Sequence, residues 1–262
     1  MIHRNPLGVA WGRTAPGVSG ALPVARTPRR VIIAILAVIM MVFGAMATAP
    51  SAHAQQYTTP ASNPAMPQTC GLDIALVFDL SNSLSDTDVA NSKAAGVAVA
   101  EGLLGTPTNV GVYSFASFAP ATNNTNLEKT SVSTQAGVNA VKNAVNALQR
   151  PPNNRGGTNW DAALKQLQGK GYDVVYFITD GEPTAYGTPG TWGNSDYGTG
   201  VDFVDVNEAI KSANTLKGEN TRIVPLGVGE INTENLVRIS GPNDYLLVNE
   251  YAQLVETLVN SV

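Results

Sequence analysis

The sequence predicts an α/β fold with a doubly wound, mostly parallel central sheet and helices on both of its faces. Short apolar runs rich in β-branched and aromatic residues alternate along the chain with stretches whose apolar residues recur at helical spacing. Two of the short runs, residues 74–78 and 174–178, are continuously apolar, which is typical of parallel strands buried on both faces. Strands that alternate with helices favour parallel connections across one sheet.

The other expected strands are shorter or more polar than these two. Residues 110–115 alternate apolar and polar side chains, as a half-buried strand does. The polar stretch 123–130 is interpreted as a loop that contains a short edge strand. Two apolar runs near the end of the chain, 223–228 and 245–248, supply the remaining strands.

The helices are predicted from apolar spacing and from their end signals. The first expected helix, residues 86–104, begins at Asp86 as its N-cap and ends at Gly105, because Asp and Gly are favoured at these positions. The second, 134–148, carries its apolar face on Val138, Val141, Val145 and Leu148. Further helices are expected just after Thr158 and at 203–216, 233–239 and 251–262.

The N-terminal residues 1–54 have the pattern of a secretory signal peptide. Three arginines precede an apolar run at residues 31–48, and the small-x-small sequence Ala52-His53-Ala54 follows it. This arrangement predicts cleavage after Ala54 and export to the cell surface or the medium. The run is also long enough for an uncleaved membrane anchor, which is the alternative. Residues 55–70, rich in Gln, Thr, Pro and Asn, are predicted to be a linker, and 71–262 a single domain.

Composition excludes two classes of function. With 16 Lys and Arg against 20 Asp and Glu, the net charge is -4, and no basic patch offers nucleic acid a binding surface. The two histidines, His3 and His53, lie in the predicted leader. A chain cleaved after Ala54 therefore has no histidine base for a serine hydrolase.

Oxygen-bearing side chains follow two of the expected strands and occupy a loop between them. The three segments are Asp79-Leu80-Ser81-Asn82-Ser83, Gly156-Gly157-Thr158-Asn159 and Ile178-Thr179-Asp180-Gly181. Ligands of open α/β sheets sit beyond the carboxyl ends of the strands, so these segments are expected to converge there. Because every donor is a hard oxygen, the set suits Mg²⁺, with Mn²⁺ or Ca²⁺ as alternatives, and argues against Zn²⁺ and Cu²⁺.

In residue type and order, these segments resemble the metal-ion-dependent adhesion site of von Willebrand factor type A domains, as in Gram-positive pilus-tip adhesins. The family pattern is Asp-x-Ser-x-Ser, a Thr on a second loop and an Asp in a Thr-Asp-Gly turn. The resemblance implies five metal ligands: Asp79, Ser81, Ser83, Thr158 and Asp180. It also implies that the ion accepts a Glu or Asp carboxylate from a protein partner, such as a host surface protein, or during pilus or cell-wall assembly.

Each of these residues also has an ordinary interpretation. Ser81 and Ser83 could cap the helix that follows them, Thr158 could cap the short helix after it, and Asp180 could be a turn residue before Gly181. Thr158 is expected at the surface. Four nearby acids are expected to lie behind the ligands or in solvent, because further carboxylate ligands would quench the ion: Asp86, Asp88, Asp161 and Glu182.

The segment 183–200 is longer than a minimal version of the family's fold requires. It begins where the strand before Asp180 ends, which places it on the same face as the predicted metal. Tyr186, Trp192 and Tyr197 stand there among Gly, Ser and Asn, a composition typical of recognition loops. The alternative is a solvated insertion whose aromatic rings pack back on the domain.

The function predicted from these features is extracellular, metal-dependent adhesion without enzymatic activity. One alternative is a Mg²⁺-dependent phosphotransferase or hydrolase of the haloacid-dehalogenase kind, but such enzymes need a second acid where Ser81 stands. The other is a surface scaffold that does not adhere. Many extracellular family members join the residue before the first strand to the chain after the last helix by a disulfide. Cys70 stands at the first point without a partner cysteine, so either the chain is truncated or Cys70 is a buried or reactive thiol.

Overall fold

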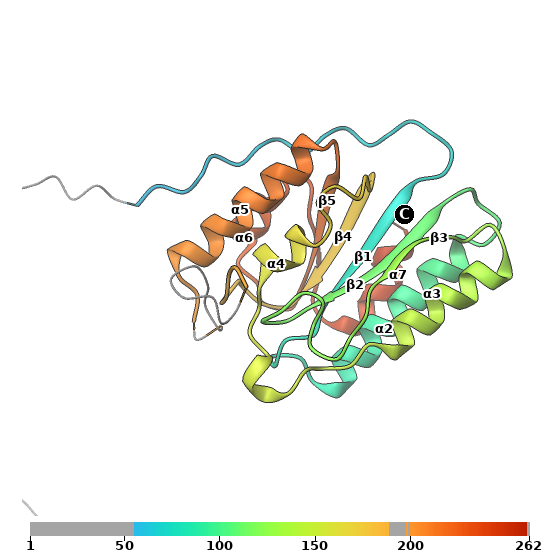
Figure 1. Cartoon of the computed structure of the whole chain (residues 1–262), viewed down its shortest axis with the longest axis horizontal. Coiled ribbons are helices and arrows are strands. Elements are labelled where there is room, and N and C mark those ends of the chain that lie inside the picture. Colours follow the sequence, from blue (N-terminus) through green and yellow to red (C-terminus); the bar gives the residue numbers. More distant parts are fainter. Residues whose placement is uncertain (1–54, 189–197, 199, 261–262) are drawn as a thin grey trace, which may run out of the picture. The chain divides into compact units, whose positions relative to one another are not determined.

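A computed structural model describes residues 55–188, 198 and 200–260. In this part of the chain, six strands form one sheet in the order β3-β2-β1-β4-β5-β6 (Figure 1). Neighbouring strands run parallel throughout, except that edge strand β3 pairs antiparallel with β2. The strands are β1 (Asp73–Asp79), β2 (Asn109–Phe115), β3 (Leu127–Ser131), β4 (Val174–Thr179), β5 (Arg222–Val228) and β6 (Leu246–Val248). The predicted mostly parallel sheet and its short edge strand are confirmed.

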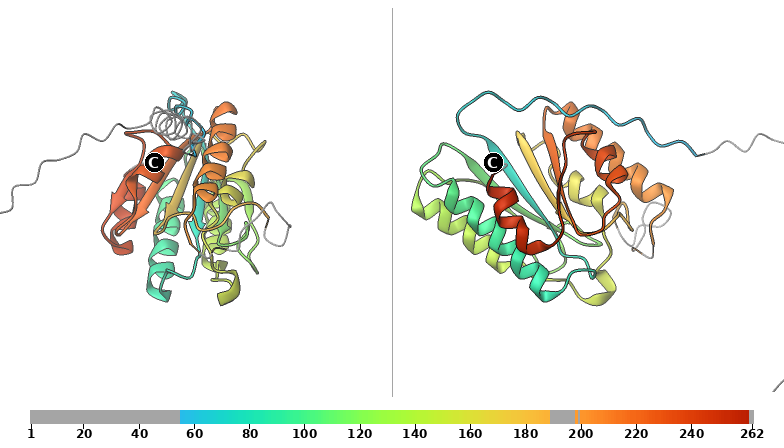
Figure 2. Two further views of the ribbon diagram at one scale, coloured as in Figure 1. Left: turned by 90° about the vertical axis from the view of Figure 1, so that its left-hand side faces the viewer. Right: turned by 180° about the vertical axis from the view of Figure 1, so that it is seen from behind.

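Helices cover both faces of the sheet, as the sequence predicted (Figures 1 and 2). One face carries α2 (Asp86–Gly102), α3 (Gln135–Ala147) and α7 (Leu254–Val259). The other carries α4 (Trp160–Lys165), α5 (Phe203–Gly218) and α6 (Thr233–Ile239). Short 3-10 turns precede two of them, η1 (Asn153–Arg155) before α4 and η2 (Tyr251–Gln253) before α7. The closing helix is therefore shorter than the expected 251–262.

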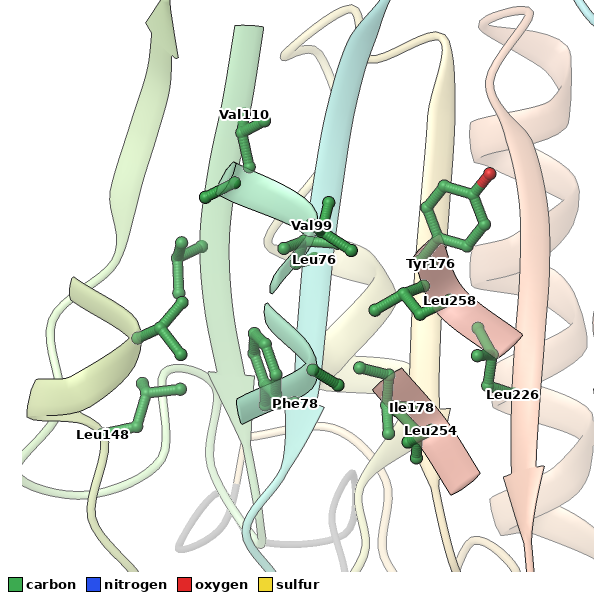
Figure 3. Packing of buried hydrophobic residues seen from close by; sticks show 14 of the residues in the cluster. Leu76, Phe78, Val99, Val110, Leu148, Tyr176, Ile178, Leu226, Leu254 and Leu258 are labelled. Atoms are coloured by element: carbon green, nitrogen blue, oxygen red, sulfur yellow. The ribbon is translucent and has the colours of Figure 1, made fainter. Parts of the chain in front are cut away.

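Side chains of each strand alternate between two apolar layers, because successive residues of a strand point to opposite faces. In β1, Leu76 and Phe78 join the layer beneath α2, α3 and α7, which Figure 3 shows. Ala75 and Val77 join the layer beneath α4, α5 and α6. A Cβ on Gly96 of α2 would lie 2.7 Å from the Phe78 ring, so glycine lets this helix approach the sheet closely. The ends of the central strands are thus fixed from both sides.

The N-cap of α2 differs from the prediction. Ser85, not Asp86, is the cap: its hydroxyl accepts from Asp88 N at 3.2 Å, and the Asp88 carboxylate accepts from Ser85 N at 2.9 Å. This reciprocal box needs a side-chain acceptor three residues after the cap, and Asp88 provides it only for Ser85. Asp86 instead forms an ion pair with Arg150.

The predicted linker contains no helix or strand, yet part of it is held on the domain. We call residues 57–64 the N-terminal strap. This segment, blue in Figure 1, runs alongside α5. Asn214 accepts from Ala61 N at 2.7 Å and donates to Thr59 O at 2.9 Å. Asn63 likewise donates to Ile223 O at 2.7 Å and accepts from Ile223 N at 2.9 Å. These contacts were not apparent from composition, because they depend on residues far along the chain.

Two further expectations concern the N-terminal side of the domain. Cys70 is exposed, so the interpretation as a buried thiol is wrong. The predicted signal peptide, residues 1–54, lies outside the described residues. Within the described ranges, no helix has the length and apolar character needed to cross a membrane.

Candidate metal site

The predicted ligands lie at the end of β1 and on loops beside the carboxyl ends of the central strands. Asp79 is the last residue of β1, and Asp180 directly follows β4, its neighbour in the sheet. The chain leaves β1 for β2 on one side and later enters β4 on the other, so the crevice between β1 and β4 is the topological switch point. Ligands of open α/β sheets bind at this position.

Two carboxylates, the backbone N–H of Ser81 and two hydroxyls form a continuous series of hydrogen bonds. Asp79 Oδ1 accepts from Ser81 N at 2.8 Å. The Ser81 and Ser83 hydroxyl oxygens lie 3.0 Å apart, and Ser83 Oγ donates to Asp180 Oδ1 at 2.9 Å. Asp79 and Ser81 are buried, whereas Ser83 is exposed and Asp180 half-buried, so the series runs from the interior to solvent.

Thr158 stands on the loop opposite the Asp180 turn. Its Oγ1 lies 3.9 Å from the position that a Cβ would take on Gly181. Its backbone N donates to Thr184 Oγ1 at 2.9 Å, and its carbonyl accepts from Thr184 N at 2.8 Å. The residue is 6% exposed, so the expectation of a surface position is wrong. These backbone bonds fix the Thr158 loop to the segment after Asp180 and bury it.

The capping interpretations of the three hydroxyl residues are wrong. The cap of α2 is Ser85, not Ser81 or Ser83. The cap of α4 is Asn159, whose Oδ1 accepts from Ala162 N at 2.8 Å. Asp180 does precede a bend, but its carboxylate also accepts a hydrogen bond from Ser83.

Burial and nearby negative charges raise the pKa values of the two acids. Asp79 is 1% exposed. Desolvation, followed by the negative charge of Asp180, raises the pKa of Asp79 to about 7, although hydrogen bonds from Ser81 and Thr179 oppose the rise. Desolvation also raises the pKa of Asp180, against the hydrogen bond from Ser83. Two acids in this condition favour a neutralising partner, either a proton or a cation.

The donor set fits a hard divalent cation. Two carboxylates and three hydroxyls offer oxygen ligands of the kind that Mg²⁺, Mn²⁺ and Ca²⁺ prefer. Over the described ranges, no group of three or more His, Cys, Asp or Glu side chains is placed to hold a metal. The additional donors near the two acids are therefore neutral hydroxyls.

Three of the four other acids nearby are bonded to groups outside the ligand set. Asp86 pairs with Arg150, and Asp88 closes the capping box of α2. Glu182 Oε1 accepts from Asn235 Nδ2 at 2.8 Å. Asp86 and Glu182 are thus directed to other partners, whereas the charge of Asp88 still helps to raise the pKa of Asp180.

The fourth acid, Asp161, is not solvated. It is fully buried and accepts from Lys165 Nζ at 2.7 Å, from Ser212 Oγ at 2.5 Å and from Gly187 N at 2.9 Å. Asp161 was expected behind the ligands or in solvent, and its burial excludes the solvent position, because α5 and the segment after β4 pack over the first turn of α4. Its charge is balanced by Lys165 one turn along the same helix.

Residues that the sequence did not single out hold the ligand loops together. Thr179 Oγ1 donates to Asp79 Oδ2 at 2.7 Å. Asn82 N donates to Gly156 O at 2.9 Å, and a Cβ on Gly156 would lie 2.1 Å from the Asn82 side-chain oxygen. Glycine at this position therefore leaves room for the Asn82 side chain to lie against the loop. Each of these residues lies inside one of the three segments from which the metal site was predicted, so its position in the sequence could have indicated its role.

The segment 183–200 is described mainly at its two ends. Tyr186 is half-buried, while Trp192 and Tyr197 lie outside the described residues. Gly187 donates its N–H to Asp161, and its carbonyl accepts from Asn159 Nδ2 at 3.1 Å. A Cβ on Gly198 would lie 2.7 Å from Gly157 Cα. Both described ends therefore touch the stretch around Thr158, and a recognition role for the segment stays a prediction.

The fold and the site define an open, doubly wound α/β domain with a cluster of oxygen donors at its switch point. The family model of the von Willebrand factor type A domain matches residues 73–260, and the chain therefore belongs to this family. A search of curated protein sequences gave no match.

Solved structures with the same fold are distant in sequence. The pilus adhesin SpaC from Lactobacillus rhamnosus GG has a TM-score of 0.55 at 16% identity, with 76% of this chain and 31% of that chain covered. The D319A mutant of the PilB minor pilin from Streptococcus sanguinis has a TM-score of 0.55 at 14% identity, with 74% of this chain and 61% of that chain covered. A von Willebrand factor type A protein from Catenulispora acidiphila has a TM-score of 0.53 at 16% identity, with 73% of this chain and 42% of that chain covered. The chain thus spans less than two thirds of each of these proteins.

Proposed function

We propose that the protein is an extracellular adhesion domain that binds a protein partner through a divalent cation. The cation would be held by Asp79, Ser81, Ser83, Thr158 and Asp180. The observation that carries the proposal is the series of hydrogen bonds from Asp79 to Asp180 through two serines that cap no helix. Family membership and the fold shared with a pilus adhesin and a minor pilin support a role at a surface.

The residues around the site leave such a cation incompletely neutralised. Only Asp79 and Asp180 would bind it through a carboxylate, because Asp86, Asp161 and Glu182 are bonded elsewhere. A bound Mg²⁺, or Mn²⁺ or Ca²⁺ in its place, supplies an electrophilic position for a Glu or Asp carboxylate of the partner. The exposed Ser83 marks the side from which the partner approaches.

In this function the protein acts outside the cell. Residues 1–54 act as a signal peptide cleaved after Ala54, and an uncleaved membrane anchor is the alternative. The partner is a host surface protein or a component of a pilus or cell wall. Mass spectrometry of the N-terminus of secreted material tests this, since a mature chain should begin at Gln55.

The enzymatic alternative finds little support at the site. A haloacid-dehalogenase type of phosphotransferase needs an acid two residues after the strand-end Asp79, and Ser81 stands there with its hydroxyl beside Ser83. We therefore propose binding without turnover.

Calorimetric titration of the purified protein with MgCl₂ tests the metal site. We expect about one ion per chain and loss of binding in Asp180→Ala. Asp86→Ala is the matched control, because this acid is paired with Arg150, and it should bind as the unaltered protein does. Unchanged Mg²⁺ binding in Asp180→Ala would remove the assignment.

A further inference from the structure

The N-terminal strap contacts the domain through an aromatic side chain near the metal-site side of α5. The Tyr57 ring stacks on Phe203, with ring centroids 4.7 Å apart. The Arg238 guanidinium lies over the same ring, 4.3 Å from its centroid. Phe203 is the first residue of α5, and Arg238 belongs to α6. Tyr57 therefore bridges two helices of this layer.

From Arg238, a series of side-chain hydrogen bonds leads to the turn that carries Asp180. Arg238 Nη1 donates to Asn235 Oδ1, and Asn235 Nδ2 donates to Glu182 Oε1 at 2.8 Å. Glu182 lies two residues after Asp180. Asn235 is 3% exposed, and both ends of its amide are engaged, which fixes its orientation. The contacts from Tyr57 to Glu182 are thus unbroken.

The rest of the strap is held on the domain mainly by hydrogen bonds to its backbone. Lys217 Nζ donates to Ala61 O at 2.7 Å, and Arg222 donates to Pro64 O at 2.7 Å. Burial lowers the pKa of Lys217 to about 8. These bonds fix the path of the strap over α5 and β5, so the Tyr57 ring reaches α6 from a defined direction.

We infer that Tyr57 is a positioning residue for the Asp180 turn, acting through Arg238, Asn235 and Glu182. The strap is then part of the site's support and not a passive linker. The inference rests on the proposed cation site at Asp180. Side chains that orient metal ligands without touching the metal commonly change its affinity about 10- to 100-fold. Tyr57 acts at the far end of the series, so we expect about a tenfold effect or less.

The test compares Tyr57→Ala with two matched variants in the purified protein. Tyr57→Ala should accelerate amide hydrogen exchange in peptides that cover residues 180–183 and weaken Mg²⁺ binding by up to about tenfold. Tyr57→Phe keeps the ring and should restore both. Thr59→Ala removes a side chain of the same strap while its carbonyl still accepts from Asn214, and it should behave as the unaltered protein does. Exchange in β2 serves as the internal reference.

A second variant breaks the series at its centre without touching the strap. Asn235→Ala should reproduce the faster exchange at 180–183, and adding Tyr57→Ala to it should cause little further change, because both act through one path. Additive effects of the two substitutions would overturn the inference. So would unaltered exchange and Mg²⁺ affinity in Tyr57→Ala, or failure of Tyr57→Phe to restore them. If the unaltered protein binds no Mg²⁺, the proposed function fails, while the exchange comparison still decides the inference.

Discussion

Strand β1 begins with Asp73 and ends with Asp79, and these two carboxylates have opposite surroundings. Desolvation acts on Asp73, but hydrogen bonds from Lys129 and Asn109 outweigh it and lower the pKa of Asp73. At Asp79, desolvation and the charge of Asp180 raise the pKa to about 7, with only neutral donors to oppose them. In the described part of the chain, Lys129 pairs with Asp73 at one end of the strand, whereas the hydrogen bonds to Asp79 at the other end come from neutral groups. An acid that the fold neutralises itself is structural, whereas a buried acid pair without a cationic partner is suited to an external ion.

The largest expected effect comes from exchanging Asp79 for alanine, with Asp73→Ala as the matched control. Asp79→Ala should abolish Mg²⁺ binding in calorimetry, because it removes the buried carboxylate of the cluster. Asp73→Ala, at the other end of the same strand, should leave Mg²⁺ binding intact. Equal loss in both variants would show that β1 as a whole, and not its carboxyl end, is required.

The second expectation concerns pH. Between about pH 4 and pH 7, folded Asp79 holds a proton that the unfolded chain has already lost, because its pKa is raised to about 7 from 3.8. The folded state therefore binds more protons in this window, and the free energy of unfolding without a divalent cation should fall as the pH rises through it. Asp79→Asn should remove this contribution. Mg²⁺ affinity should weaken as the pH falls below about 7, since protons compete for the same carboxylate.

These pH effects distinguish the two ends of β1. The pKa of Asp73 is lowered, so its contribution to stability is present above the unfolded value of 3.8 and is lost as the pH falls through its folded pKa. Urea unfolding at several pH values, with EDTA or with Mg²⁺, measures how the free energy of unfolding changes with pH in both regions. A slope between pH 4 and 7 that survives Asp79→Asn would contradict the assignment to this residue.

The third expectation concerns the hydroxyl of Thr158. Thr158→Val keeps the shape but removes the oxygen, so Mg²⁺ affinity should fall about tenfold or more while the fold persists through the backbone bonds to Thr184. Thr158→Ser keeps the hydroxyl and should retain binding. In a panel of immobilised host surface proteins, binding should disappear in EDTA and weaken in Thr158→Val. Full binding of the partner in EDTA would contradict the metal-dependent mechanism and leave only the fold assignment.

The smallest effect is expected at the opposite end of the sheet. Lys129→Met removes the ion pair with Asp73, whose side chains are 30% and 28% exposed. Pairs at this degree of exposure contribute about 1 kcal/mol or less, so the melting temperature should change little and Mg²⁺ binding not at all. A large loss of Mg²⁺ affinity in Lys129→Met would show that the two ends of β1 are coupled.

The strands and the acids at their ends could be predicted because the evidence for them is local. Residues 74–78 and 174–178 are apolar runs, and Asp79 and Asp180 follow them directly, so the parallel sheet was sufficient to bring the acids together. The series through Ser81 and Ser83 then follows from short loop spacing.

The remaining features depend on tertiary contacts that a single sequence does not reveal. The sequence left open whether Asp161 lies behind the ligands or in solvent, because its burial requires Ser212 and Gly187, from other parts of the chain. The strap looked like a linker because its partners lie on α5, β5 and α6. The N-cap of α2 was predicted one residue too late. The capping box of Ser85 with Asp88 was visible in the sequence, but Asp86 also matches the residue preference of an N-cap.

The strap also imposes an order on events during synthesis. Thr58 bonds to Asn207, which is 149 residues further along the chain. The seat of the strap therefore does not exist until α5 has been made, and until then the strap and the predicted cleavage site just before it remain accessible to a processing peptidase. The strap thus emerges from the ribosome well before the helix that holds it.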